Sequence, residues 1–260
     1  MLIKLNLKKS VNENASEYFE KAKKFRKKLE GSLETKNKYE QKLKELVEKQ
    51  KVEEENKIEV SDRKKHWYEK FRWFFTSTGF LVIGGRDATS NEIVIKKHTD
   101  PEDLVFHTDM AGSPFFVLKT EGKDVDKETL KEVANATCTF SRAWKLELQT
   151  QKVFYVKPEQ VSKTPKSGEY LSKGAFMIYG KTNYIDNSVD LCVCKLEDGS
   201  LMAAPENAVR KKSKDYVKLI QGREKPSSVA KVIKKELNYN DLDDIIRILP
   251  AGGFKIVKHA

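Results

Sequence analysis

The first third of the chain carries a narrow apolar stripe on a strongly charged background. From about residue 13 to about residue 48, apolar residues recur at steps of three and four between Lys and Glu. This is the spacing of a coiled coil, with Ser10 or Asn12 as the residue that caps the helix. Gly31 interrupts the stripe and lowers helix propensity locally. The clearest members of the stripe are Tyr18, Ala22, Phe25, Leu29, Leu33, Tyr39, Leu43 and Leu46.

The segment after this helix has little to bury. Residues 50–59 are almost wholly charged, and we interpret them as the tip of a helical hairpin whose narrow stripe is covered by an antiparallel return. Ser61 and Asp62 would cap a returning helix that reaches to about residue 75. In this prediction a coiled-coil stalk covers residues 1–61 and a second domain covers residues 62–260. The alternative is that the stripe pairs with another molecule.

An aromatic segment follows, and its spacing is helical. Trp67, Phe71 and Phe74 are separated by four and three residues, which would place them on one face of a helix. Gly79 could end that helix in a left-handed conformation. Trp67, Trp73 and Phe74 are interpreted as core rather than as platforms for base stacking.

A short apolar run and two glycines come next. Phe80–Ile83 predicts a buried strand, which Gly84 and Gly85 end with a turn. Asp87 or Thr89 would cap the next helix, which runs to about Lys97; a capping box between Thr89 and Glu92 is one way to start it.

The rest of the chain alternates short apolar runs with turn residues. Asp126 and Pro226 can open helices, and a last short helix is expected over residues 242–249. Strands outnumber long helices and several connections are short, so we expect an α+β fold: a mixed, largely antiparallel sheet with packed helices, preceded by the long coiled-coil hairpin. The remaining strands are expected at residues 104–107, 115–118, 153–156, 175–179, 191–194, 201–203 and 216–220.

Composition favours a polyanionic partner. The 260 residues carry a formal net charge of +11, with 38% hydrophobic and 34% charged residues, which favours nucleic acid or an anionic surface. The first seven residues lack the apolar segment of a secretory signal and no apolar run is long enough to cross a membrane, so we expect a cytoplasmic protein. Three cysteines suit core packing better than a disulfide framework or a zinc site.

Two short motifs could carry chemistry. Gly84-Gly85-Arg86-Asp87 could bind an anion through backbone amides, the helix N-terminus and the Arg86 guanidinium; otherwise it is a tight turn in which Arg86 pairs with Asp109. His107 and Asp109 lie on one face at a strand end and could form a hydrogen-bonded pair or contact a ligand. Metal hydrolysis is poorly supported by four histidines in the chain. We predict no catalytic residues, no metal and no cofactor.

An ordered series of blocks resembles the NFACT-R domain of NFACT proteins, the group that includes bacterial and archaeal fibronectin-binding protein A and eukaryotic nuclear export mediator factor. The end of the chain, Asp243–Gly253, is similar to the archaeal branch. The blocks are Trp67–Phe74, Gly84–Asp87, Asn91–Glu92, Lys96–Lys97, His107–Asp109, Phe140–Trp144, Gln160–Lys163, Ser167–Tyr170, Gly174–Ile178 and Gly180–Lys181.

The resemblance implies an RNA- and ribosome-binding module in which Arg and Lys contact phosphates and a coiled coil precedes the domain. The implied partners are the large ribosomal subunit and tRNA or rRNA. The family's N-terminal NFACT domain and helix–hairpin–helix segments are not recognisable, so we expect a C-terminal fragment or split version without tailing activity of its own. The predicted RNA-binding residues are Arg86, Asp87, Lys96, Lys97, His107, Asp109, Arg142, Lys163, Lys166 and Lys181.

Three other functions stay open at this point. One is an adaptor whose coiled coil recruits a protein or a second copy of the chain. Another is a general nucleic-acid binder that also accepts DNA, because phosphate contacts hardly distinguish the two. The third is an enzyme that acts on RNA or a nucleotide through His107, Asp109 and Glu169.

Overall fold

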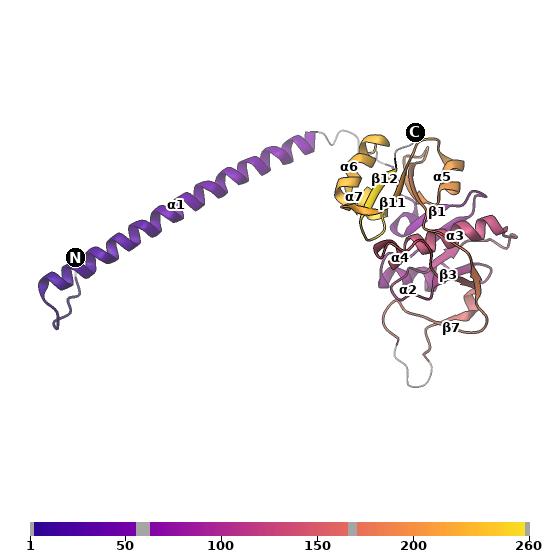
Figure 1. Cartoon of the computed structure of the whole chain (residues 1–260), viewed down its shortest axis with the longest axis horizontal. Helices are drawn as coiled ribbons and strands as arrows, with labels where there is room; N and C mark the ends of the chain where they lie inside the picture. Colours follow the sequence, from indigo (N-terminus) through magenta and orange to yellow (C-terminus); the bar gives the residue numbers. More distant parts are fainter. Residues whose placement is uncertain (1–2, 56–62, 166–170, 258–260) are drawn as a thin grey trace. The chain divides into compact units, whose positions relative to one another are not determined.

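The computed structural model describes residues 3–55, 63–165 and 171–257, with the backbone alone for residues 49–55. The chain divides into two compact units, Met1–Glu59 and Val60–Ala260. Figure 1 shows the long helix of the first unit and the mixed helices and strands of the second.

The first unit consists mainly of helix α1 (Val11–Glu55). Ser10, one of the two caps that the sequence allows, starts the helix in a capping box: the Ser10 amide donates to the Glu13 carboxylate at 2.7 Å, and the Glu13 amide donates to Ser10 Oγ at 3.3 Å. Asn14 is buried and accepts a hydrogen bond from the Asn6 amide at 2.8 Å, which holds the preceding segment against the helix.

The apolar stripe of α1 is exposed within the described part of the chain. Phe25, Leu29 and Leu43 are each more than 60% exposed. The helix continues beyond residue 50, where the sequence predicts a hairpin tip, and residues 56–62 lie outside the described residues. Residues 63–75 contain no α-helix, so the predicted return to about residue 75 is wrong over this segment.

The aromatic segment forms a strand instead of the predicted helix. Its beginning is a single 3-10 turn, η1 (Trp67–Lys70), followed by β1 (Arg72–Phe75). β1 pairs antiparallel with β2 (Leu81–Gly84), with Trp73 opposite Ile83. Gly79, at φ +96°, lies in the turn between the two strands. Trp73 and Phe74, neighbours that point to opposite faces of β1, are both buried, and such a run carries no alternation that would distinguish a strand from a helix. Trp67 is 48% exposed, so its prediction as a core residue is wrong.

The larger sheet has six strands in the order β1-β2-β4-β3-β5-β8, and all of its pairings are antiparallel. Helix α3 packs on β3, β4 and β5, and α2 packs on β2. Asp126 caps α3 as predicted, accepting a hydrogen bond from the Thr129 amide at 2.8 Å. The remaining elements of this part are α2 (Ala88–Lys97), β3 (Leu104–Thr108), β4 (Phe116–Leu118), α3 (Lys127–Thr139), α4 (Arg142–Lys145), β5 (Val153–Val156), η2 (Pro158–Gln160) and β8 (Asn183–Ile185).

A second sheet has four strands in the order β10-β9-β11-β12, again antiparallel, and β6 pairs with β7 separately. The two larger sheets meet where β1 lies against β10, and the Phe75 amide donates to Met202 Sδ at 3.4 Å. Helices α6 and α7 pack on each other beside this sheet (Figure 1). The elements are β6 (Val161–Ser162), β7 (Met177–Ile178), β9 (Leu191–Lys195), β10 (Leu201–Ala204), α5 (Glu206–Lys212), β11 (Tyr216–Glu224), α6 (Pro226–Glu236), α7 (Leu242–Ile248) and β12 (Phe254–Val257).

The predicted α+β class, with a largely antiparallel sheet, is confirmed. The strand predicted over residues 175–179 shrinks to two residues in β7, and the sequence reasoning missed β8, α5 and β12. Within the described residues, no helix combines the length and apolar character needed to cross a membrane.

Candidate nucleic-acid interface

The diglycine turn is dictated by close packing. A side chain on Gly84 would place its Cβ 2.5 Å from the ring of Phe116, and one on Gly85 would lie 1.8 Å from Asn91 Oδ1. Asn91 cannot retreat easily, because its Oδ1 accepts a hydrogen bond from the Phe115 amide at 3.2 Å. The glycines therefore let the strand, the turn and helix α2 approach one another.

The backbone amides of this turn are already used. Ser90 Oγ accepts from the amides of Arg86 at 2.8 Å and Asp87 at 2.9 Å, and Asp87 Oδ1 accepts from the Ser90 amide at 2.8 Å. The bond from the Ser90 amide to the Asp87 carboxylate is the main reason that the pKa of this group lies below its usual value. The capping box thus joins Asp87 to Ser90, not Thr89 to Glu92, and the amides that an anion would need have internal partners.

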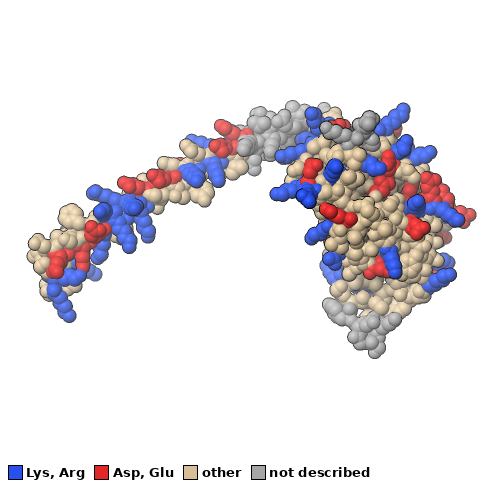
Figure 2. All heavy atoms as spheres, in the orientation of Figure 1, with Lys and Arg blue, Asp and Glu red and all other residues tan. Residues whose placement is uncertain are grey.

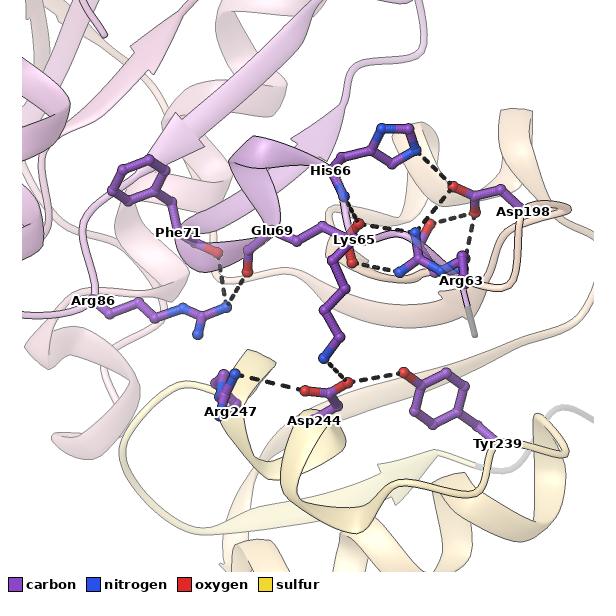
Figure 3. Close-up of polar contacts among 11 residues, drawn as sticks. Arg63, Lys65, His66, Glu69, Phe71, Arg86, Asp198, Tyr239, Asp244 and Arg247 are labelled. Carbon is purple, nitrogen blue, oxygen red and sulfur yellow. Dashed lines mark hydrogen bonds and ion pairs between the residues drawn. The ribbon is translucent and has the colours of Figure 1, made fainter. Parts of the chain in front are cut away.

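The Arg86 side chain leaves the turn and fixes the backbone of the preceding segment (Figure 3). Its Nη2 donates to the carbonyl oxygens of Glu69 at 3.0 Å and Phe71 at 2.8 Å. The predicted alternative, an ion pair with Asp109, does not form, because Asp109 instead accepts from the Tyr184 hydroxyl at 3.2 Å. Among the described residues Arg86 has no carboxylate within ion-pair distance.

Glu92 forms ion pairs with two of the predicted RNA-binding lysines. Its carboxylate pairs with Lys163 Nζ at 2.8 Å and Lys96 Nζ at 3.2 Å, and accepts from the Gly174 amide at 3.1 Å. Lys163 also donates to the Ala175 carbonyl at 2.8 Å. Glu92 of α2 therefore holds both Lys163 and Gly174, the two residues through which the connecting loop is attached to this helix.

Replacing Glu92 by Gln is expected to loosen this loop. The hydrogen bonds from Lys163, Gly174 and Lys96 lower the pKa of Glu92 to about 2. Because the folded-state pKa is depressed, the tether is complete above the ordinary carboxyl value and is lost as the pH falls towards about 2. Hydrogen exchange at neutral pH should show several-fold faster exchange of the Gly174 amide in Glu92→Gln; unchanged exchange would contradict the tether. Glu128→Gln, on α3, is the matched control and should leave that amide unchanged.

His107 and Asp109 have separate partners. The His107 ring lies 4.1 Å from that of Phe115, centroid to centroid, and its Nε2 lies 3.2 Å from the Ser113 carbonyl oxygen. Burial lowers the pKa of His107, which favours the neutral ring. Glu169, the third residue of the enzyme hypothesis, lies outside the described residues. The geometry of His107 is that of a packed side chain with a satisfied nitrogen.

The other predicted cations lie on the surface. Lys97, Arg142 and Lys181 are exposed, and none of the three forms an ion pair within the described residues. Arg142 lies beside the loop that follows Asp109, since a Cβ on Gly112 would be 3.0 Å from its Cδ. Lys166 lies outside the described residues. On the face of the second unit seen in Figure 2, Lys and Arg are interspersed with acidic groups rather than gathered in one continuous field.

The cysteines are buried thiols, and one lies near two carboxylates. Ligand atoms of Asp190, Cys192 and Glu206 lie within 4.8 Å of one another. Lys218 pairs with the Glu206 carboxylate, and Asp190 accepts from the Glu206 amide at 2.8 Å. Burial raises the pKa of Cys192, which disfavours a thiolate. The arrangement is that of an internal ion-pair network.

Comparison with known proteins identifies the central part of this unit. Residues 70–180 match the family described as the NFACT protein RNA binding domain. The archaeal Rqc2 homolog aRqcH of Methanocaldococcus jannaschii is 45% identical over 221 residues, which cover 82% of this chain and 32% of that protein. The human ribosome quality control complex subunit NEMF is 37% identical over 180 residues, covering 67% of this chain and 16% of that protein.

A solved structure of the C-terminal part of the fibronectin/fibrinogen-binding protein from Streptococcus suis also matches. The identity is 16% and the TM-score 0.38, over 50% of this chain and 48% of that one. The chain spans 32% of the length of the M. jannaschii protein and 16% of the length of human NEMF.

Residues 70–180 are thus an RNA-binding domain, set within an α+β unit that continues beyond them. By this match, residues 70–180 belong to the NFACT-R family of domains.

Proposed function

We propose that this chain is the RNA-contacting module of a cytoplasmic ribosome quality control factor, which binds tRNA or large-subunit rRNA through phosphate contacts. The observation that carries the proposal is the match of residues 70–180 to an RNA-binding domain. Exposed cations without an acidic partner, such as Lys97, Arg142 and Lys181, supply the chemistry, because such groups bind phosphates without losing an internal ion pair. The role is binding, with no catalytic step assigned.

The test is a salt series of binding to tRNA, a large-subunit rRNA fragment and duplex DNA. Arg86 and Lys163 are poor choices for substitution, since both hold backbone carbonyls in place. The triple variant Lys97→Ala/Arg142→Ala/Lys181→Ala removes only surface charge. We expect it to weaken structured-RNA binding about tenfold or more and to reduce the magnitude of the salt slope by up to about 3.

The matched control removes the same charge from helix α6. Lys231→Ala/Lys234→Ala/Lys235→Ala should leave the affinity for structured RNA within about twofold of the wild type if the interface is local. Equal losses in both variants would indicate nonspecific attraction. Equal, weak binding of all three ligands, unchanged by either variant, would contradict RNA binding by this surface. DNA bound as tightly as RNA would favour a general nucleic-acid binder.

The exposed stripe of α1 favours a second function, recruitment of a protein or of a second copy. Phe25, Leu29 and Leu43 would be covered in such a complex, whereas an isolated helix leaves them in water. Sedimentation of the full chain over a range of concentrations tests self-association directly. A constant monomeric mass, together with unchanged partner capture after deletion of residues 10–60, would remove this candidate.

A further inference from the structure

A cavity of about 260 Å³ is lined by Arg86. Its walls come from the segment before β1 and from helix α7 with the residue Tyr239 that precedes it, and Figure 3 shows these two sides facing each other. Four basic residues and two carboxylates line the cavity: Lys65, Lys70, Arg86 and Arg247, with Glu69 and Asp244.

The inner wall carries positive charge without a directly paired carboxylate in the part of the chain that the structure describes. Burial and then the charge of Arg247 lower the pKa of Arg86, while the charges of Asp244 and Asp87 favour its charged form. Arg86 is bonded to carbonyl oxygens only, and its Nε is buried without a hydrogen-bond partner among the described residues. Arg72, behind it, donates to the carbonyl of Leu249 at 3.4 Å and also has a buried, unpartnered Nε. Burial, and then the nearby charge of Arg86, lower the pKa of Arg72 to about 10. Two neighbouring guanidinium groups without a carboxylate are costly unless an anion joins them.

The two carboxylates of the cavity are occupied by other cations. Glu69 forms a two-nitrogen pair with Arg63, with one distance of 2.8 Å, and also accepts from the His66 amide. Asp244 pairs with Lys65 Nζ at 2.6 Å and accepts from the Tyr239 hydroxyl at 3.2 Å. Neither carboxylate lies within ion-pair distance of Arg86 among the described residues.

Arg247 of helix α7 also lines the cavity. Arg247 lies 3.7 Å from Asp244 Oδ1, a long contact to a carboxylate already bound by Lys65, and its side chain is 55% exposed. Figure 3 shows Arg247 across the cavity from Arg86. Two guanidinium groups on opposite walls can each direct N–H groups at one tetrahedral oxyanion.

We propose that this cavity binds a phosphate group of RNA between Arg86 and Arg247, an inference that rests on the proposed RNA-binding function. Its volume is just below the range of sites for whole small molecules, which suits a phosphate with part of its nucleoside. The indole of Trp67 and the imidazole of His66 at the wall provide flat surfaces against which a sugar or base can lie. The phosphate can be internucleotide or terminal, since both present the same oxygens.

Arg247→Ala is the informative variant, and Arg223→Ala on β11 is its control. Both residues are exposed arginines, so each substitution removes one charge without opening the core. Trp67 and Trp73 line the cavity and report on it through their fluorescence. Titration with inorganic phosphate, against chloride at equal ionic strength, should give a saturable change in the wild type and in Arg223→Ala, weakened about tenfold in Arg247→Ala.

Single-stranded RNA with a 5′-phosphate or a 5′-hydroxyl distinguishes the two sources. A loss of about tenfold in Arg247→Ala only for the phosphorylated RNA assigns a terminal phosphate, and an equal loss for both assigns an internucleotide phosphate. The proposal is overturned if Arg247→Ala matches Arg223→Ala in the phosphate titration and with both RNAs. If Lys97→Ala/Arg142→Ala/Lys181→Ala still weakens RNA binding in that case, the proposed function stands without this pocket.

Discussion

Replacing Lys119 by Met is expected to lower the free energy of unfolding by about 4 kcal/mol. The Lys119 ammonium pairs with Asp103 and Asp100 and donates to the His98 carbonyl at 3.2 Å. The Asp103 side chain is 1% exposed and that of Lys119 is 14% exposed. Removing the cation leaves a carboxylate in the interior whose remaining partners, among the residues that the structure describes, are the amides of Asp100 and Thr120.

The chain offers a matched control four residues away. Lys123 pairs with Glu121 at 2.8 Å, but both side chains are more than 60% exposed. Lys123→Met should therefore change the free energy of unfolding by no more than about 0.5 kcal/mol. Denaturant unfolding followed by tryptophan fluorescence reports on the second unit, because all three tryptophans lie there. Similar losses in the two variants would contradict the assignment of a buried ion pair.

Elements with strong local signals were predictable from the sequence. The apolar runs at Leu104 and Val153 and the helix starts at Asp126 and Pro226 are all found in the structure. In each case the residues that define the element are adjacent: a continuous apolar run bounded by polar residues, or a cap and the helix it opens. No distant part of the chain has to be known for such signals to be interpreted correctly.

The aromatic segment shows where local spacing misleads. Trp67, Phe71 and Phe74 fit a helical face, yet Phe74 belongs to a strand and Trp67 to a single 3-10 turn. Aromatic residues favour strands, and pairing with β2 across a tight turn supplies hydrogen bonds to both strands of the hairpin. The tertiary pairing thus decides between two structures that the spacing alone allows.

The candidate site depends even more on distant residues. The sequence singles out Arg86, but its partners are the carbonyls of Glu69 and Phe71, and the wall opposite comes from Asp244 and Arg247, about 160 positions later. Every residue has a backbone carbonyl, so the side chains do not indicate which carbonyls Arg86 will bind. The residues around Arg86 in the sequence likewise do not indicate that helix α7 will lie opposite it. The exposure of Lys97 and Lys181 could be predicted, because lysine is rarely buried without a partner; their contact with RNA stays a prediction.

Replacing Gly85 by Ala is expected to lower the free energy of unfolding by about 3 kcal/mol. The new Cβ would lie 1.8 Å from Asn91 Oδ1 and 2.8 Å from the Asn91 backbone nitrogen, so helix α2 itself must move. That displacement would break the bond from the Phe115 amide to Asn91 and shift Arg86 from the carbonyls that it holds. RNA or phosphate binding through Arg86 should weaken together with stability.

The same substitution at Gly31 should have the opposite sign. Gly31 lies within α1, and a Cβ there would meet no atom within 4 Å. Alanine should therefore stabilise the helix by about 1 kcal/mol, because it restricts the unfolded backbone and favours helical dihedral angles. Thermal melts followed by far-ultraviolet circular dichroism measure α1, and tryptophan fluorescence measures the second unit. If Gly85→Ala is as stable as the wild type, helix α2 can move away from the turn at no cost. Close packing would then not be the reason that glycine is needed at position 85.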